Sequence, residues 1–368
     1  MQAHAPNVPE NPSRILVRGT NWVGDTVMSL PAAKQLRSLF PSAHITLWCP
    51  DGLKVLWETT GIPDQVISFS ADSGGPLRRS LRMSKRIASQ NFDLVVLFQN
   101  AFESAFTAWL ARIPYRVGYG TDLRGPLLNI KVPQTDEIRL KHEVFYYLAI
   151  TDFLADSIQR SITHENETPD CSISLDAEKM ETARAMMLSG NFDLNRPVFC
   201  LCPGSVNSDA KRWPADYFAE LADLLIQADG QVVFLGAPKE YDLINTIQSL
   251  MKHRGSMNLT RTSDMITAMA VMNLADTVIS NDTGSAHLAA AAGASVLTIF
   301  GPTSPGATAP YGNRSYTIRG EAPCAPCRHF KCPLATQLCM RNIKPASVFR
   351  RIQSISDGAV HRLSSAPR

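Results

Sequence analysis

Short apolar runs alternate with segments of helical periodicity along the chain, and the alternation occurs twice. The first set predicts strands at 14–18, 44–49, 65–69 and 92–98, with helices that include 78–90 and 102–112. The second predicts strands at 198–202, 232–236, 277–280 and 295–300, with helices at 215–228 and from about residue 285. Apolar strands joined by helices are typical of a parallel sheet covered on both faces. The polar stretch 159–181 separates the two sets. We therefore expect two doubly wound α/β domains, at 14–170 and 180–350, facing each other across a cleft.

Composition supports a globular chain without a membrane span. The 368 residues are 45% apolar, and no stretch approaches the roughly 20 apolar residues that a spanning helix needs. The most apolar stretch, Leu288–Gly301, is broken by small and polar residues and is typical of a helix running into a strand. The first 14 residues are polar, without the basic start and apolar core of a secretory signal. We expect a soluble, cytoplasmic protein.

The positive charge of the chain is small and unevenly placed. A net charge of +3 argues against bulk nucleic-acid binding. Residues 1–160 carry 17 basic and 14 acidic side chains, whereas residues 161–368 carry 19 of each. The densest basic group is Arg78, Arg79, Arg82, Lys85 and Arg86, on one predicted helix. Two interpretations stay open: a solvated helix face, or a binding surface for an anionic partner.

The loop after the first strand, from Gly19 to Thr26, has the spacing of a phosphate-binding P-loop with one decisive change. Asp25 stands where such a loop needs its lysine. A carboxylate there would repel a triphosphate, which disfavours an ATPase. Asp25 has two alternative roles: the N-cap of the following helix, or a general base.

Three loops in the second half have features of a diphosphate site. Small residues 203–205 follow one strand, and a cation, Lys211, comes shortly after. The segment 281–287 ends a strand and begins a helix, where exposed amides and the helix dipole attract anions. The alternative is a capped helix start with a satisfied His287. A further loop at 301–305 follows the next strand. Together the loops predict a nucleotide-diphosphate site.

The motifs NWVGD, CPGS with AKRWP, and NDTGSAHLAAAAG with FGPTSP resemble those of the ADP-heptose:lipopolysaccharide heptosyltransferases, glycosyltransferase family nine. The resemblance covers roughly Arg14–Val348. It is closest to the heptosyltransferase II branch, which FQNAFESA and IPYRVGY also resemble. It implies a GT-B fold of two Rossmann-like domains, the first receiving the lipopolysaccharide acceptor and the second holding the ADP-sugar.

The resemblance also implies site residues. Asp25 matches the proposed catalytic base of the family, and the positions matching its donor site are Ser205, Lys211, Glu240, Asp282, Thr283, Gly284 and His287. The run 205–210 departs from the acidic-aromatic-glycine run more common in the family, and Thr283 replaces its usual serine. The basic group Arg78, Arg79, Arg82, Lys85 and Arg86 would bind the anionic acceptor, in peripheral contact with the inner face of the inner membrane.

The implied reaction is an inverting transfer of heptose from ADP-heptose to the heptosylated inner core (Hep-Kdo-lipid A). The alternative within the family is heptosyltransferase I or another sugar-nucleotide core transferase. An epimerase or dehydrogenase should show GxGxxG after the first strand, and GTNWVGD does not supply it. A binding module without catalysis would tolerate loss of Asp25.

No cofactor is expected to be required, because no DxD-like metal motif is present. The cysteines Cys324, Cys327, Cys332 and Cys339 have a spacing compatible with a four-thiolate zinc or iron–sulfur site. The alternatives for this group are a structural metal, reduced buried thiols and a redox role.

Overall fold

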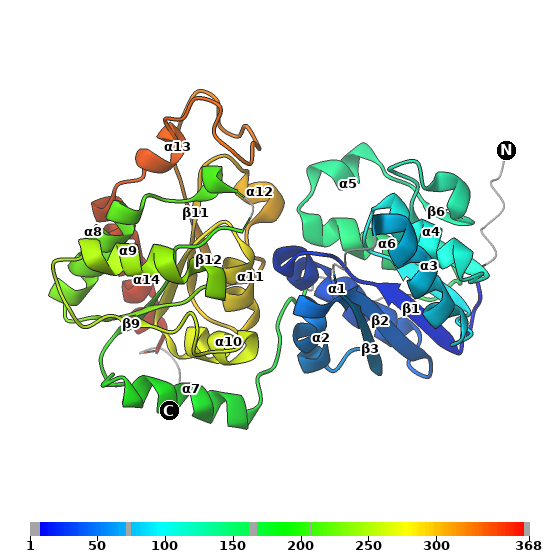
Figure 1. The fold of residues 1–368 in the computed structure, drawn as a ribbon, viewed down its shortest axis with the longest axis horizontal. Helices are drawn as coiled ribbons and strands as arrows, with labels where there is room; N and C mark the ends of the chain where they lie inside the picture. The colour runs from blue at the N-terminus through cyan, green and yellow to red at the C-terminus, as the bar shows by residue number, and fades with distance from the viewer. Residues whose placement is uncertain (1–7, 71–74, 162–167, 207, 364–368) are drawn as a thin grey trace. The chain divides into compact units, whose positions relative to one another are not determined.

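The structure, a computed structural model, describes residues 8–70, 75–161, 168–206 and 208–363, with side chains to Ile355 (Figure 1). The chain divides into two compact units, Met1–Cys171 and Ser172–Arg368. Part of the predicted link, residues 162–167, lies outside the described residues, and the helix α7 (Ala177–Ser189) begins inside the remainder.

Unit 1 is a parallel sheet covered by helices. Its strands are β1 (Arg14–Arg18), β2 (His44–Pro50), β3 (Gln65–Phe69), β4 (Leu94–Leu97), β5 (Tyr115–Tyr119) and β6 (Ile130–Val132). Its helices are α1 (Val23–Leu39), α2 (Lys54–Thr60), α3 (Gly75–Ala88), α4 (Phe102–Leu110), α5 (Asp136–Leu140) and α6 (Glu143–Ser157).

Unit 2 repeats this architecture. Its strands are β7 (Val198–Cys202), β8 (Gln231–Phe234), β9 (Met257–Asn258), β10 (Thr277–Asn281), β11 (Val296–Phe300) and β12 (Ser315–Arg319). Besides α7, its helices are α8 (Ala215–Gln227), α9 (Tyr241–Leu250), α10 (Met265–Leu274), α11 (Gly284–Ala291), α12 (Pro305–Thr308), α13 (Leu338–Arg341) and α14 (Pro345–Leu363).

The strand order fixes where ligands bind. Unit 1 has the order β3-β2-β1-β4-β5-β6, and unit 2 the order β12-β11-β10-β7-β8-β9. All the pairings are parallel. Counted from the first strand of each unit, both sheets follow the Rossmann order 3-2-1-4-5-6. The order reverses between β1 and β4 in unit 1 and between β7 and β10 in unit 2. These two positions are the switch points of the sheets. Ligands of such sheets bind at the carboxyl ends of these strands.

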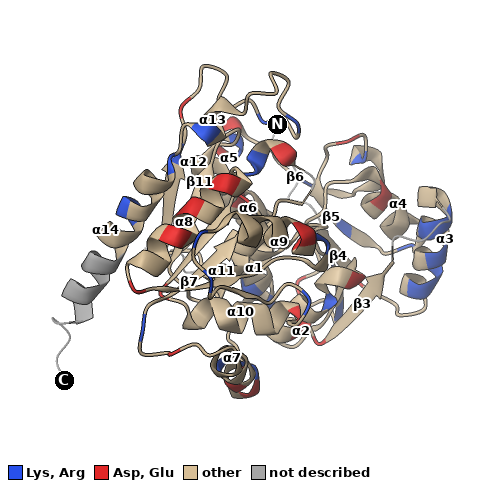
Figure 2. Cartoon of the chain, turned by 60° about the vertical axis from the view of Figure 1, so that its left-hand side comes forward, with Lys and Arg blue, Asp and Glu red and all other residues tan. Residues whose placement is uncertain are grey.

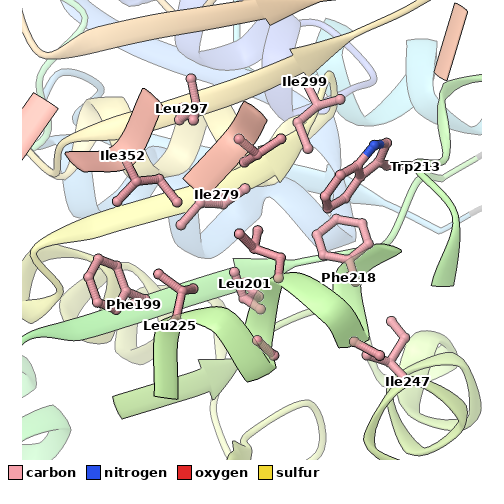
Figure 3. Packing of buried hydrophobic residues seen from close by; sticks show 14 of the residues in the cluster. Phe199, Leu201, Trp213, Phe218, Leu225, Ile247, Ile279, Leu297, Ile299 and Ile352 are labelled. Atoms are coloured by element: carbon pink, nitrogen blue, oxygen red, sulfur yellow. The ribbon is translucent and has the colours of Figure 1, made fainter. Parts of the chain in front are cut away.

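The core of unit 2 shows why its apolar runs become buried strands. Leu201, Ile279 and Leu297 come from three neighbouring strands and are 0% exposed (Figure 3). Helix α8 packs against this face through Phe218 and Leu225, whose spacing puts them on one side of the helix. Burying each such side chain contributes about 1.5–3 kcal/mol. This core fixes the strand ends that carry the loops of the site.

None of the helices in the described parts of the chain is both long and apolar enough to cross a bilayer.

Candidate active site

Asp25 lies at the carboxyl edge of the unit 1 sheet, directly after β1. Helix α1 begins at Val23 and its N-cap is Trp22, so Asp25 is the third helical residue. The N-cap alternative for Asp25 is therefore wrong: the chain turns earlier, and the Thr26 N–H already donates to the Trp22 carbonyl at 2.9 Å. A carboxylate in the first turn of a helix is favoured by the helix dipole. The Asp25 side chain is half-buried. The burial of Tyr147, together with the nearby charge of Asp25, raises the pKa of Tyr147.

A buried arginine holds the loop that leads to Asp25. The Arg18 guanidinium donates to the Gly19 carbonyl and, at 2.6 Å, to the Asn21 side chain. It also lies 4.7 Å from the centre of the Trp48 ring, within cation–π range. Burial lowers the pKa of Arg18 to about 10, far enough above neutrality that it stays charged. Arg18 is not among the residues predicted from the sequence, although a charge at the end of the apolar run RILVR was a signal.

A second polar network holds the loop after β4, the other strand at the switch point of unit 1. Arg124 is 0% exposed and donates to the Gln99 carbonyl and, at 2.5 Å, to the Asn100 side chain. Asn100 donates in turn to the Tyr146 hydroxyl at 2.5 Å. Burial lowers the pKa of Arg124 to about 10 and raises that of Tyr146 to about 12. This network was not predicted from the sequence because its members are far apart in the chain.

The basic group lies on α3, as Figure 2 shows. Arg78, Arg82, Lys85 and Arg86 are exposed. Arg79 is partly buried and forms a bidentate pair with Glu103 of α4, with both N–O distances at 2.6 Å. This pairing raises the pKa of Arg79. Its charge is therefore already compensated by Glu103, which distinguishes Arg79 from the four exposed cations of the group.

Three loops of unit 2 meet at its switch point. Lys211 ends a 3₁₀ turn after β7, and its Nζ lies 2.7 Å from Oδ2 of Asp282, the residue after β10. Thr303, in the loop after β11, donates its hydroxyl to the same Oδ2 at 2.7 Å. The Asp282 side chain is only 5% exposed and that of Lys211 is 26% exposed. The carboxylate is buried while the cation keeps access to solvent, so Lys211 can still contact an anion.

Asn281, the last residue of β10, fastens these loops together. Its side-chain amide donates to the carbonyls of Pro203 and Gly204 at 2.8 and 3.2 Å, and it accepts from the Trp213 N–H at 3.1 Å. Ser205 follows directly on this loop. Its Oγ is buried and has no hydrogen-bond partner among the residues that the structure describes. An unpaired buried hydroxyl costs about 1–3 kcal/mol, so a bound ligand is the expected partner.

Glu240 reaches the same loop from the 3₁₀ turn after β8. Its Oε2 accepts from the Ala237 N–H at 2.8 Å, and the residue is 7% exposed. Its carboxylate packs against the Cα of Gly204, where a Cβ would lie 2.0 Å from Oε1. Ser205, Lys211, Glu240 and Asp282 are thus brought together.

The start of α11 lies beside this cluster. Thr283 occupies the N-cap, its side chain makes no capping hydrogen bond, and Gly284 begins the helix. The alternative of a side-chain cap is therefore wrong for Thr283, and Asp282 uses its carboxylate on Lys211 and Thr303 instead. The start of α11 can attract an anion through the helix dipole and its backbone amides. His287, one turn into the helix, is 4% exposed.

Gly204→Ala tests this packing. The added methyl group would displace the Glu240 carboxylate from the Ala237 N–H, and we expect a loss of about 1–3 kcal/mol in the free energy of unfolding, as for other overpacked sites. Gly306→Ala is the matched control, since its Cβ would meet only the Ser304 hydroxyl at 3.9 Å. Urea unfolding of both variants measures the difference. Equal stability of the two variants would contradict this arrangement.

The four cysteines near the C-terminus are free thiols. Cys339 is buried, Cys324 is exposed, and Cys327 and Cys332 are partly exposed, so the buried-thiol alternative fits only Cys339. Burial raises the pKa of Cys339, whereas the backbone N–H groups of Gln337 and Leu334 lower that of Cys332. Within the described ranges, no three His, Cys, Asp or Glu side chains are arranged to hold a metal ion. The structural-metal alternative stays a prediction.

Two heptosyltransferases are similar in sequence to this protein over most of its length. Lipopolysaccharide heptosyltransferase 2 of Escherichia coli (strain K12) is 26% identical over 317 residues, which cover 83% of this chain and 88% of that protein. Lipooligosaccharide heptosyltransferase 2 of Haemophilus ducreyi is 28% identical over 319 residues, with the same coverage.

A solved structure confirms the fold. The structure of E. coli ADP-heptose lipopolysaccharide heptosyltransferase II matches with a TM-score of 0.77 and 23% identity, covering 93% of this chain and 98% of that one. The predicted GT-B class of two Rossmann-like domains is therefore correct. The sequence model of the protein family glycosyltransferase family 9 (heptosyltransferase) matches residues 80–337, well over half of the chain. The chain is a glycosyltransferase and belongs to glycosyltransferase family 9, the heptosyltransferase family.

Proposed function

We propose that this protein transfers a heptose from ADP-heptose to the heptosylated inner core of lipopolysaccharide (Hep-Kdo-lipid A), with inversion at the anomeric carbon. The observation that carries the proposal is the cluster at the switch point of unit 2. There the partly exposed Lys211 ammonium and the buried Ser205 hydroxyl lie on loops tied to the start of α11. The relatives named heptosyltransferase 2 support the choice of sugar and acceptor.

The bond changes assign a role to Asp25. An acceptor hydroxyl oxygen attacks the anomeric carbon, the bond from that carbon to the ADP oxygen breaks, and the hydroxyl proton passes to the Asp25 carboxylate. A single displacement inverts the configuration and needs no covalent intermediate. The negative carboxylate also favours the positive charge that develops on the sugar, as in glycoside hydrolysis. The loop held by Arg18 sets the position of this base.

The leaving ADP gains negative charge as the bond breaks. Lys211 and the amides at the start of α11 would stabilise that charge, which is the transition-state interaction that accelerates such reactions. Ser205 would donate its hydroxyl to a phosphate oxygen. By resemblance to the family, Glu240 would lie near the nucleoside. Its carboxylate would also shape the loop at Gly204. Asp282 would orient Lys211 through their 2.7 Å contact, and Thr283, Gly284 and His287 would border the diphosphate and the sugar.

The acceptor is an anionic lipid, and α3 offers exposed cations to it. We place the protein at the cytoplasmic face of the inner membrane, in peripheral contact with it. Exposed charges are screened within about 8 Å at physiological ionic strength, so added salt should weaken this contact.

Neutralising α3 tests its role in acceptor binding. We expect Arg78→Ser combined with Lys85→Ser to raise the KM for the membrane-embedded acceptor at least about fivefold, since each cation contributes on the order of 1 kcal/mol near an anionic surface. The KM for ADP-heptose should not change. Arg184→Ser, which removes an exposed cation from α7 in unit 2, is the control. An unchanged acceptor KM in the double variant would show that the basic group is only a solvated helix face.

The reaction itself is tested on the product. Mass spectrometry should find the acceptor heavier by one heptose residue, and nuclear magnetic resonance should find the configuration opposite to that of the donor. ADP-heptose should be preferred over UDP-sugars. A retained configuration, or efficient transfer from a UDP-sugar, would contradict the proposal.

A further inference from the structure

Helix α4 carries a stripe of aromatic rings that faces away from the core of unit 1. Phe102, Phe106 and Trp109 recur at helical spacing, whereas the opposite face, with Ala105 and Ala108, is buried. Phe102 is 46% and Trp109 47% exposed. The rings stack along the helix, with centroids 5.7 Å apart for Phe102 and Phe106 and 6.1 Å apart for Phe106 and Trp109. They form one continuous apolar surface.

Helix α3 packs beside α4 and adds cations and further apolar side chains. The bidentate Arg79–Glu103 pair joins the two helices. Leu77 and Leu81 of α3 are 61% and 44% exposed. Helix α3 has five basic and no acidic residues, and the only acidic residue of α4 is the paired Glu103 (Figure 2). The two helices therefore present apolar rings and exposed positive charge together.

This combination identifies the partner by its chemistry. Exposed aromatic side chains beside Lys and Arg are typical of protein surfaces that enter the headgroup region of a bilayer, where rings are favoured and cations meet anionic lipids. A purely aqueous surface would not favour three stacked rings. An acidic headgroup layer over an apolar interior complements both components.

The placement of the two helices relates this surface to the chemistry. Both begin at the carboxyl edge of the unit 1 sheet, after β3 and β4. Strand β4 is the neighbour of β1, whose loop carries Asp25. A bilayer held by α3 and α4 would therefore present a lipid-linked hydroxyl to the edge that holds the base.

We infer that α3 and α4 form a docking face for an anionic lipid bilayer, with the Phe102–Phe106–Trp109 stripe entering the headgroup region and the α3 cations binding the headgroups. The inference rests on the proposed function, in which the acceptor is a membrane lipid.

Vesicle binding of the full chain tests the docking face. The protein should sediment with vesicles of phosphatidylcholine and phosphatidylglycerol and much less with phosphatidylcholine alone. Phe102→Ser combined with Trp109→Ser should lower the partition coefficient by about tenfold or more, because the buried ring area is lost. Phe330→Ser, which removes a ring 72% exposed in unit 2, should bind like the wild type. Equal binding by the double variant would overturn the inference.

Tryptophan fluorescence gives a second measurement that needs no destabilising change. Trp48, Trp57 and Trp213 are at most 3% exposed, whereas Trp22 and Trp109 are 54% and 47% exposed. Anionic vesicles should shift the emission of the wild type to the blue. The shift should persist in Trp22→Phe and disappear in Trp109→Phe. A shift that persists in Trp109→Phe would overturn the proposed insertion.

Activity on a water-soluble, deacylated acceptor separates this inference from the proposed function. The double variant at Phe102 and Trp109 should transfer heptose to that acceptor at the wild-type rate. If the wild type binds vesicles through α4 but transfers no heptose to any acceptor, the docking face stands and the proposed function fails. If a concentration-dependent dimer, rather than vesicle binding, is lost in the double variant, the stripe is an interface between copies and the inference is wrong.

Discussion

Replacing Asp25 by asparagine is expected to lower kcat for heptose transfer by about 10²–10⁴-fold, the usual contribution of a general base. The amide has nearly the same shape as the carboxylate but cannot take the acceptor proton. Asp25 is the third residue of α1 and not its N-cap, so the substitution leaves the cap residue Trp22 unchanged. The lost interaction with the helix dipole amounts to only about 0.3–1 kcal/mol of stability.

Glu178→Gln is the matched control for Asp25→Asn. Glu178 is also an acidic residue in the first turn of a helix, α7, but it is exposed and far along the chain from the switch-point loops. Steady-state turnover at saturating donor and acceptor, together with thermal unfolding, separates catalysis from stability. Turnover near that of the wild type in Asp25→Asn would remove this residue from the mechanism.

Replacing Lys211 by alanine is expected to lower kcat/KM for ADP-heptose by about 10²–10³-fold, the range found when one donor to a developing oxyanion is removed. The Lys211 side chain is 26% exposed and that of Asp282 is 5% exposed. Asp282 therefore orients the ammonium, which stays accessible to a diphosphate. The substitution also removes the ammonium from the Asp282 carboxylate, which keeps its hydrogen bond from the Thr303 hydroxyl. Part of the loss can therefore come from an uncompensated buried charge.

Two further variants separate the lost phosphate contact from that uncompensated charge. Lys211→Arg keeps a cation next to Asp282 and should recover much of the donor kcat/KM. Lys179→Ala breaks another lysine–aspartate pair of unit 2, Lys179 with Asp264 at 2.8 Å, and should leave donor use unchanged. If Lys211→Ala retains the donor kcat/KM of the wild type, Lys211 does not act on the leaving group.

The repeated α/β architecture was predictable because its strands are short apolar runs. The sequence prediction matches β1, β3 and β7 in both bounds. Other elements have no such signal. Strand β6 has three residues, and its central Lys131 is exposed. Helix α6 contacts α1 and places apolar residues around most of its circumference, so no one-sided stripe distinguishes it.

The candidate site was predictable loop by loop but not as an assembly. Ser205, Lys211 and Asp282 stand in small-residue loops after buried strands, and that pattern pointed to them. Their contacts depend on β7 and β10 being neighbours, a pairing that no local pattern encodes. The same holds for the hydrogen bond from the Asn281 side chain to the Pro203 carbonyl and for the Arg124–Asn100 contact, which joins residues 24 positions apart.

The most direct test of the proposed function is ADP release from ADP-heptose with two acceptors, one carrying no core heptose and one carrying a single core heptose. We predict release only with the mono-heptosylated acceptor. Release with the heptose-free acceptor would show that the protein adds the first heptose instead. No release with either acceptor would contradict ADP-heptose as the donor.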